Sequence, residues 1–183
     1  MGRAEESLAK ISRVLKSASE EEGAEAAVAL LLRASGQDFE VLLVKRVESP
    51  TDFWSGQVAL PGGRREVQDE DLKQTAVRET SEETGVDLIH DCSFLGVLEA
   101  STSAGRHVKV LPFVFFLERE ISVRLNRSEL AEYAWVELRD LIEHKGTAKF
   151  SFGEFPAFII DNYVVWGLTY RILESFFQAL KLL

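Results

Sequence analysis

Apolar positions along this chain repeat first at helical spacing and then at strand spacing. Between Leu8 and Leu15 they mark one face of a helix, which predicts an amphipathic helix that packs on the protein and ends near the acidic turn at 20–23. Two short apolar runs follow, 26–33 and 39–46, and the turn between them contains glycine and aspartate. This pattern predicts a β-hairpin.

A proline and two glycines interrupt the next apolar run. The run at 58–60 should end as a strand at Pro61, because proline lacks a backbone donor and the glycines that follow permit conformations closed to other residues. From 71 to 84 there is neither proline nor glycine, Asp71 can cap the first turn, and Gly85 can end the last. We therefore predict a helix over 71–84.

The second half of the chain carries further strands and two more helices. Strands are predicted at 94–99, at 108–117 with an interruption at Pro112, and at 135–136. Helices are predicted at 138–144 and 162–182. Strands flanked by helices at the start, middle and end indicate an α/β fold, in which a single domain over 1–183 sandwiches a mixed β-sheet between helices.

Composition and charge narrow the function classes. With 183 residues, 46% of them hydrophobic, the chain can build an ordinary core, which excludes a disordered protein. A formal net charge of -9 gives little support for binding nucleic acid. No stretch is apolar enough for a signal peptide or a membrane span, and Cys92, the sole cysteine, excludes an intramolecular disulfide. We expect a cytoplasmic protein with neither nucleic-acid nor membrane partners.

Three glutamates of the predicted helix form the candidate metal site. Glu79, Glu82 and Glu83 are three and four residues apart, so they converge on one side of the helix. Packed carboxylates repel one another unless a counter-charge is present, and oxygen ligands favour Mg²⁺ or Mn²⁺. Backbone carbonyls of the glycine turn near Gly62 can approach the same ion. Arg78 can orient a neighbouring carboxylate or contact a substrate.

An acidic helix face by itself is usually a solvated face. Here a strand, a glycine turn, a spaced acid and the helix occur together and in order, from Leu60 to Leu88, and this stretch resembles the Nudix box, G-x5-E-x7-R-E-U-x-E-E-x-G-U. The matching residues are Glu70, Arg78, Glu79, Glu82, Glu83 and Gly85.

Two positions differ from the box. Thr80 stands where an apolar residue is usual, and six residues rather than five separate Gly63 from Glu70. The branch of the family similar to coenzyme A diphosphatases has this longer spacing, with an aspartate where Asp69 stands. The longer spacing is therefore interpreted as a feature of that branch.

Segments outside the box also resemble that branch, at 42–46, 56–63 and 165–169. One pair of positions differs, because the branch carries a basic residue and a histidine where this chain has Asp52 and Trp54. An acid there would repel the 3′-phosphate of coenzyme A, which argues against coenzyme A as the substrate.

The resemblance implies a Nudix-type α/β/α sandwich and a metal-dependent diphosphatase. The box glutamates and a carbonyl near Gly62 would hold Mg²⁺ or Mn²⁺, which neutralises charge and activates water. Glu79 or Glu129, an acid from a loop beyond the box, would accept the proton, and Glu129 is slightly favoured. A surface or helix-capping role fits Glu129 equally well.

Aromatic and polar residues outside the box supply candidates for substrate binding. These are Arg46, Gln57 and Trp54, with Phe53 beside them, and the aromatics fit either a core or a surface that stacks on adenine. Four tail aromatics predict a hydrophobic cover or the surface of a homodimer: Phe150, Phe152, Phe155 and Phe158.

Three function classes stay open from the sequence. The first is a diphosphatase for coenzyme A or its thioesters, and the second is a diphosphatase for ADP-ribose or another small-molecule nucleotide. The third is a non-catalytic Nudix module that only binds its ligand. Retention of the complete acid set favours catalysis over the third class.

Overall fold

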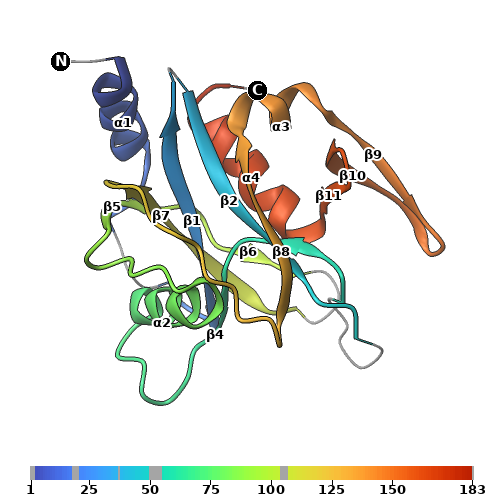
Figure 1. Cartoon of the computed structure of the whole chain (residues 1–183), viewed down its shortest axis with the longest axis horizontal. Helices are drawn as coiled ribbons and strands as arrows, with labels where there is room; N and C mark the ends of the chain where they lie inside the picture. The colour runs from blue at the N-terminus through green and yellow to red at the C-terminus, as the bar shows by residue number, and fades with distance from the viewer. Residues whose placement is uncertain (1–2, 18–20, 37, 50–54, 104–106, 183) are drawn as a thin grey trace.

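The computed structural model describes residues 3–17, 21–36, 38–49, 55–103 and 107–182 (Figure 1). The helices are α1 (Arg3–Val14), α2 (Leu72–Thr84), α3 (Leu138–Glu143) and α4 (Gly167–Ala179). The strands are β1 (Ala26–Ser35), β2 (Asp38–Arg46), β3 (Val58–Ala59), β4 (Gly62–Arg64), β5 (Cys92–Val97), β6 (Ser101–Thr102), β7 (Lys109–Leu117), β8 (Leu130–Glu137), β9 (Lys145–Phe150), β10 (Gly153–Ile160) and β11 (Tyr163–Trp166).

Strand β1 lies at the centre of a mixed eight-stranded sheet. It pairs in parallel with β7 and antiparallel with β2 and β4. The strand order is β3-β2-β1-β7-β5, with β8 paired to β2 and β6 paired to β7. The hairpin predicted from the first two apolar runs is confirmed as β1 and β2.

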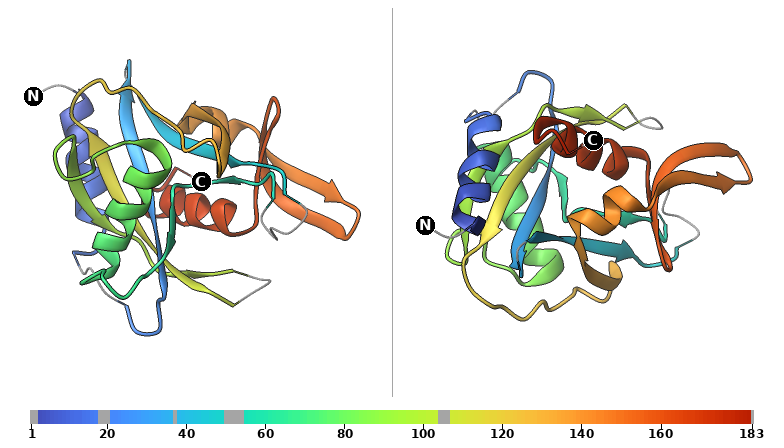
Figure 2. Two further views of the ribbon diagram at one scale, coloured as in Figure 1. Left: turned by 60° about the horizontal axis from the view of Figure 1, so that its bottom comes forward. Right: turned by 90° about the horizontal axis from the view of Figure 1, so that it is seen from above.

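Successive residues of β1 point to opposite faces of the sheet, and helices cover both faces (Figure 2). Ala29 and Leu31 pack in one apolar cluster with Leu72 of α2. Leu30 and Leu32 pack in a second cluster, to which α1, α3 and α4 contribute. The predicted α/β/α sandwich around a mixed sheet is therefore confirmed.

Helix α1 ends at Val14, earlier than the predicted boundary near 20–23. Just after the helix, the N–H of Lys16 donates to the carbonyl of Val97 (3.0 Å) and the N–H of Val97 donates back (2.8 Å). The chain becomes extended after Val14 because the end of β5 pairs with both the N–H and the carbonyl of Lys16.

Strand β7 continues through Pro112, where an interruption was predicted. Pro112 lies opposite Val28 of β1. On the other edge of β7, Phe113 pairs with β5 and Val110 pairs with β6, so Pro112 falls where the edge partner changes. A residue without an N–H is tolerated at such a gap in the ladder.

The prediction of a helix from 162 was wrong for its first residues. Tyr163–Trp166 is strand β11, and α4 begins at Gly167, whose φ of 62° lies in the left-handed region. The β-branched pair Val164 and Val165 favours the strand. No element was predicted for 145–160, which forms β9 and β10 and completes a three-stranded sheet that projects from the body (Figure 1).

Among the described helices, none combines the length and the apolar character needed to cross a bilayer.

Candidate active site

The glycine corner before α2 is a short strand held against the centre of the sheet. Strand β3 ends at Ala59, one residue before the end of the predicted run 58–60, and the two glycines begin a new strand, β4, in which Gly63 lies opposite Ala27. Because backbone groups alternate sides along a strand, Gly62 turns its N–H away from β1. That N–H donates to Oε2 of Glu83 at 2.9 Å.

Close packing explains why both corner residues are glycines. A Cβ atom on Gly63 would lie 2.4 Å from a carboxylate oxygen of Glu79, and one on Gly62 would lie 2.3 Å from the backbone carbonyl of Ala27. The φ of 151° at Gly62 also disfavours other residues. The corner and the glutamates of α2 are therefore in direct contact.

The three glutamates of helix α2 differ in solvent exposure. Asp71 caps the helix by accepting from the N–H of Gln74, and Gly85 closes it at φ 70°, both as predicted. The side chain of Glu82 is 57% exposed and that of Glu79 only 17%, while Glu83 is buried. Thr80, at the position that is usually apolar, is completely buried, so it occupies a core position.

Arg78 joins the glutamates of α2 to the loop before the helix. Its Nη1 donates to Glu79 at 3.0 Å and to Glu82 at 3.3 Å. Its Nε and Nη2 bind both oxygens of Asp69, at 3.0 and 2.9 Å, and Nη2 also binds the carbonyl of Arg64 at 3.1 Å. This network supports the structural role of Arg78 that the sequence left open, because all five N–H groups of the guanidinium have acceptors within the protein.

Asp69, and not Glu70, is the acid that anchors Arg78. Asp69 is buried and also accepts from the N–H of Glu66 and the hydroxyl of Thr75, each at 2.9 Å. Glu70 is exposed. Five residues separate Gly63 from Asp69, so Asp69 has the spacing of the box acid. Seven residues separate Glu70 from Arg78, also as in the box, so spacing alone does not decide between the two acids.

Two charged neighbours shift each other's pKa in this network. The guanidinium of Arg78 holds the pKa of the Asp69 carboxyl well below its usual range. The Asp69 carboxylate in turn raises the pKa of Arg78. The pair therefore stays fully charged over the physiological pH range.

The three box glutamates do not meet at one point. Arg78 holds Glu79 and Glu82, whereas the N–H of Gly62 holds Glu83. Within the described ranges, no three acidic, histidine or cysteine side chains form a ready-made ligand set. The donors nevertheless suit a hard cation, because they are carboxylate oxygens beside a glycine corner that leaves no room for a Cβ.

The carboxyl of Glu83 is buried, and its pKa is strongly shifted. Desolvation raises its pKa to about 7, although the Gly62 N–H and the charge of Arg46 act in the opposite direction. Burial also raises the pKa of Glu79, against the effect of Arg78. A bound divalent cation would favour the ionised form of both groups.

Glu129 lies close enough to these carboxylates to raise the pKa of Glu79 and of Glu83 by its charge. The loop before β8 carries it there, because the N–H of Asn126 donates to the carbonyl of Glu83 at 2.9 Å. The side-chain amide of Asn126 then donates to Oε1 of Glu129 at 2.8 Å. The structure thus brings Glu129 to the box, as expected of a further acid.

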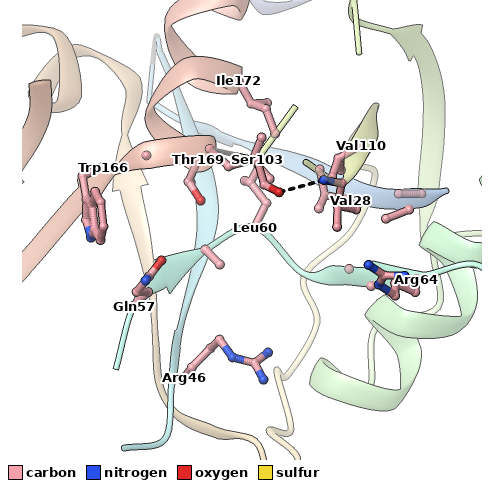
Figure 3. A pocket seen from close by; sticks show the side chains of 18 of the residues that line it. Val28, Arg46, Gln57, Leu60, Arg64, Ser103, Val110, Trp166, Thr169 and Ile172 are labelled. Carbon is pink, nitrogen blue, oxygen red and sulfur yellow. Dashed lines mark hydrogen bonds between the residues drawn. The ribbon is translucent and has the colours of Figure 1, made fainter. Parts of the chain in front are cut away.

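A cavity of about 630 Å³ opens beside the glycine corner (Figure 3). Arg46 and Gln57, two predicted substrate-binding residues, both line it, and the N–H of Arg46 donates to the carbonyl of Gln57 at 3.0 Å. Trp54, the third, and Phe53 lie outside the described residues. Arg64, which the sequence did not single out, also lines this cavity.

Three of the four tail aromatics pack together on the three-stranded sheet of β9, β10 and β11, the C-terminal sheet. Phe150, Phe152 and Phe155 pack around Trp166, with ring centroids 4.5 to 5.9 Å from its ring. Phe158 instead is completely buried in the core. Phe152 and Phe155 line the cavity, so this part of the tail faces the candidate site. The prediction of a dimer surface stays a prediction.

The buried carboxyl of Glu83 predicts an unusual pH dependence of stability. A carboxyl whose folded pKa of about 7 exceeds the ordinary 4.5 destabilises the fold once the unfolded chain ionises. We expect the metal-free protein to lose on the order of 3 kcal/mol of unfolding free energy from this group as the pH rises from 4.5 to above 7. Urea unfolding in EDTA at pH 5 and pH 8 measures the loss.

The matched variants are Glu83→Gln, which should remove this loss, and Glu82→Gln, which should keep it because Glu82 is exposed. The same pH dependence in wild type and Glu83→Gln would show that Glu83 ionises normally.

The chain was compared with known protein families and solved structures. Residues 23–157 match the NUDIX domain. An uncharacterised protein of Schizosaccharomyces pombe is 42% identical over 56% of this chain and 33% of its own length. A mitochondrial coenzyme A diphosphatase of Mus musculus is 34% identical over 70% of this chain and 63% of its own length.

The crystal structure of the MutT protein from Methanosarcina mazei Go1 superimposes with a TM-score of 0.51 and 29% identity, over 68% of this chain and 85% of that one. The chain spans between a third and about two thirds of the first curated relatives, 33%, 50% and 63% of their lengths. The family match includes β1, β4 and all of α2, which carry the corner and the glutamates described above. This chain belongs to the Nudix family.

Proposed function

We propose that this chain is a metal-dependent diphosphatase that hydrolyses the P–O–P linkage of a nucleoside diphosphate derivative. Coenzyme A and its thioesters are the first substrates to test. The observation that carries this proposal is Glu83, a buried carboxyl fixed by the Gly62 N–H and lacking a full counter-charge, beside a cavity that bears Arg46.

Glu79, Glu82 and Glu83, with the carbonyl of Gly62, would hold Mg²⁺ or Mn²⁺. When bound, the ion supplies neutralisation of the diphosphate and makes water more acidic. Arg78 is a positioning residue, because its bonds to Glu79 and Glu82 fix these side chains on one side of α2. The retained carboxylates favour this reaction over a module that only binds its ligand.

A proton must leave the attacking water as the P–O–P bond breaks. Glu129 is the proposed acceptor, because its Oε1 is held by Asn126 near the box and no salt bridge to Glu129 is seen within the described part of the chain. Glu79 is the alternative acceptor. It is the second choice because one of its carboxylate oxygens already accepts from Arg78 at 3.0 Å and because it is also a proposed metal ligand.

The cavity favours an anionic substrate. Arg46 and Arg64 line it, and no acidic side chain is among its described lining residues, although the whole chain carries a net charge of -9. Positive charge at this mouth would bind phosphate oxygens. The relative from Mus musculus, whose name states coenzyme A, makes coenzyme A the leading candidate. Asp52 favours other nucleotides instead, because an acid at this position would repel the 3′-phosphate of coenzyme A.

A panel of diphosphates tests this function. Purified protein with Mg²⁺ or Mn²⁺ would be given coenzyme A, ADP-ribose and nucleoside triphosphates, with products identified by mass. From coenzyme A we expect 3′,5′-ADP and 4′-phosphopantetheine, and no turnover in EDTA. Cleavage of ADP-ribose alone would indicate a diphosphatase for ADP-ribose or another nucleotide. Binding without cleavage of any compound would indicate a ligand-binding module. The cytoplasmic location stays a prediction from the sequence.

A further inference from the structure

The residues that line the cavity change from charged to aromatic along its length. One end is formed by Arg46 and the glycine corner, next to the glutamates of α2. The other end is formed by Trp166 and Phe155 of the C-terminal sheet. Figure 3 shows Trp166 and Arg64 on opposite sides, with Leu60 between them. A molecule whose diphosphate lies at the glycine corner would therefore extend one arm toward the aromatic residues.

The walls between the two ends are aliphatic. They comprise side chains of β1, β7 and α4, among them Val28, Val110, Leu168 and Ile172. Ser103 is one of the few polar groups there, and its hydroxyl already accepts from the N–H of Val108 at 3.0 Å. Thr169 supplies another hydroxyl. A sugar or a base buried between these walls would find few partners to replace its hydrogen bonds to water.

We propose that this apolar compartment binds a hydrocarbon chain carried by the substrate, so that apolar diphosphates bind better than those with a polar nucleoside at each end. The proposal rests on the proposed diphosphatase function for the position of the diphosphate. Trp166, Leu168 and Ile172 lie beyond residues 23–157, the part of the chain that matches the NUDIX domain. The preference would thus come in part from elements outside the matched domain, and not from the box.

Fatty-acyl thioesters of coenzyme A and prenyl diphosphates both join a hydrocarbon chain to a diphosphate, the first through the pantetheine arm and the second directly. In both, water adds across the P–O–P bond and the hydrocarbon is chemically untouched. The two sources are distinguished by comparing butyryl with decanoyl coenzyme A, and isopentenyl with farnesyl diphosphate.

Binding in EDTA, measured by isothermal titration calorimetry, separates this inference from catalysis. Each methylene that is fully buried contributes about fourfold to affinity. Allowing for partial burial, we expect the Kd to fall at least tenfold from the short to the long member of one series. The series that shows the fall identifies the source of the chain.

Two variants test the place of binding. Phe152→Ser removes a 65% exposed ring, so the fold should tolerate it, and Leu168→Gln places an amide on the half-buried wall. Each should reduce the ratio of short-chain to long-chain Kd at least threefold. Tyr133→Ser is the matched control, because Tyr133 of β8 is an exposed aromatic outside the described lining of the cavity. It should leave the ratio unchanged.

The outcomes are distinct. Equal affinity for short and long chains in both series overturns the inference, even if coenzyme A is hydrolysed and the proposed function stands. A chain-length effect that Phe152→Ser and Leu168→Gln leave intact also overturns it, because the chain would then bind elsewhere. A chain-length effect that both variants reduce, without hydrolysis of any diphosphate in Mg²⁺, supports the apolar compartment and contradicts the diphosphatase proposal.

Discussion

Replacing Glu82 or Glu83 by glutamine should lower kcat at least about a hundredfold in saturating Mg²⁺, while the fold is retained. Loss of one ligand carboxylate removes charge that stabilises the transition state, which is worth several kcal/mol. Glutamine keeps the shape and, at position 83, an oxygen that can still accept from the N–H of Gly62. Steady-state kinetics together with circular dichroism check both parts.

Glu129→Gln and Glu143→Gln complete this experiment. If Glu129 accepts the proton, Glu129→Gln should lose turnover but still bind Mn²⁺, whereas the changes at 82 and 83 should weaken Mn²⁺ binding. Glu143, exposed at the end of α3, is the control and should keep wild-type kcat. Wild-type kcat in either Glu82→Gln or Glu83→Gln would contradict the assignment of the metal ligands.

Replacing Asp69 by asparagine should cost more stability than neutralising any other carboxylate of the box. The change removes the charge that opposes Arg78, whose side chain is 16% exposed, and leaves the guanidinium without its main partner. Since Arg78 keeps Glu79 and Glu82, we expect a loss of about 2–4 kcal/mol, below the full cost of breaking a buried pair. This corresponds to a fall in Tm of roughly 5–15 °C.

Glu70→Gln is the matched control for Asp69→Asn, because the two acids are adjacent and Glu70 is exposed. Its effect should stay within about 0.5 kcal/mol. The stability that Asp69 contributes is present above its ordinary pKa of 3.8 and is lost as the pH falls below that value. A larger loss from Glu70→Gln than from Asp69→Asn in thermal unfolding at pH 7 would show that the structure assigns the wrong acid to Arg78.

The sequence was sufficient to predict the helix that carries the candidate site, because local rules apply there. Helix spacing placed Glu79, Glu82 and Glu83 on α2, and the capping residues Asp71 and Gly85 marked its ends. Which neighbouring acid would bind Arg78 was harder to predict. That choice depends on the turn in which the N–H of Asp69 donates to the carbonyl of Glu66, and a pattern of charges does not contain this geometry.

The C-terminal sheet shows where local patterns fail. Residues 163–166 are apolar and directly precede a helix, so their spacing fits a continuation of that helix. They form β11 because they pair antiparallel with the edge of β10, where Phe158 lies opposite Val165. Such pairing depends on tertiary structure, which overrides weak local preferences. The aromatic end of the cavity was consequently missed, although its phenylalanines had been noted.

The pairing of β4 with β1 has a consequence for how substrate is received. Gly62 and Gly63 are bonded to the strand at the middle of the sheet, so detaching them would require partial melting of the innermost part of the protein. The phosphate end of the ligand thus meets a preformed, stiff surface. The opposite end of the cavity, with Phe152 and Trp166, belongs instead to the separate three-stranded sheet, so a change there would leave the phosphate end in place.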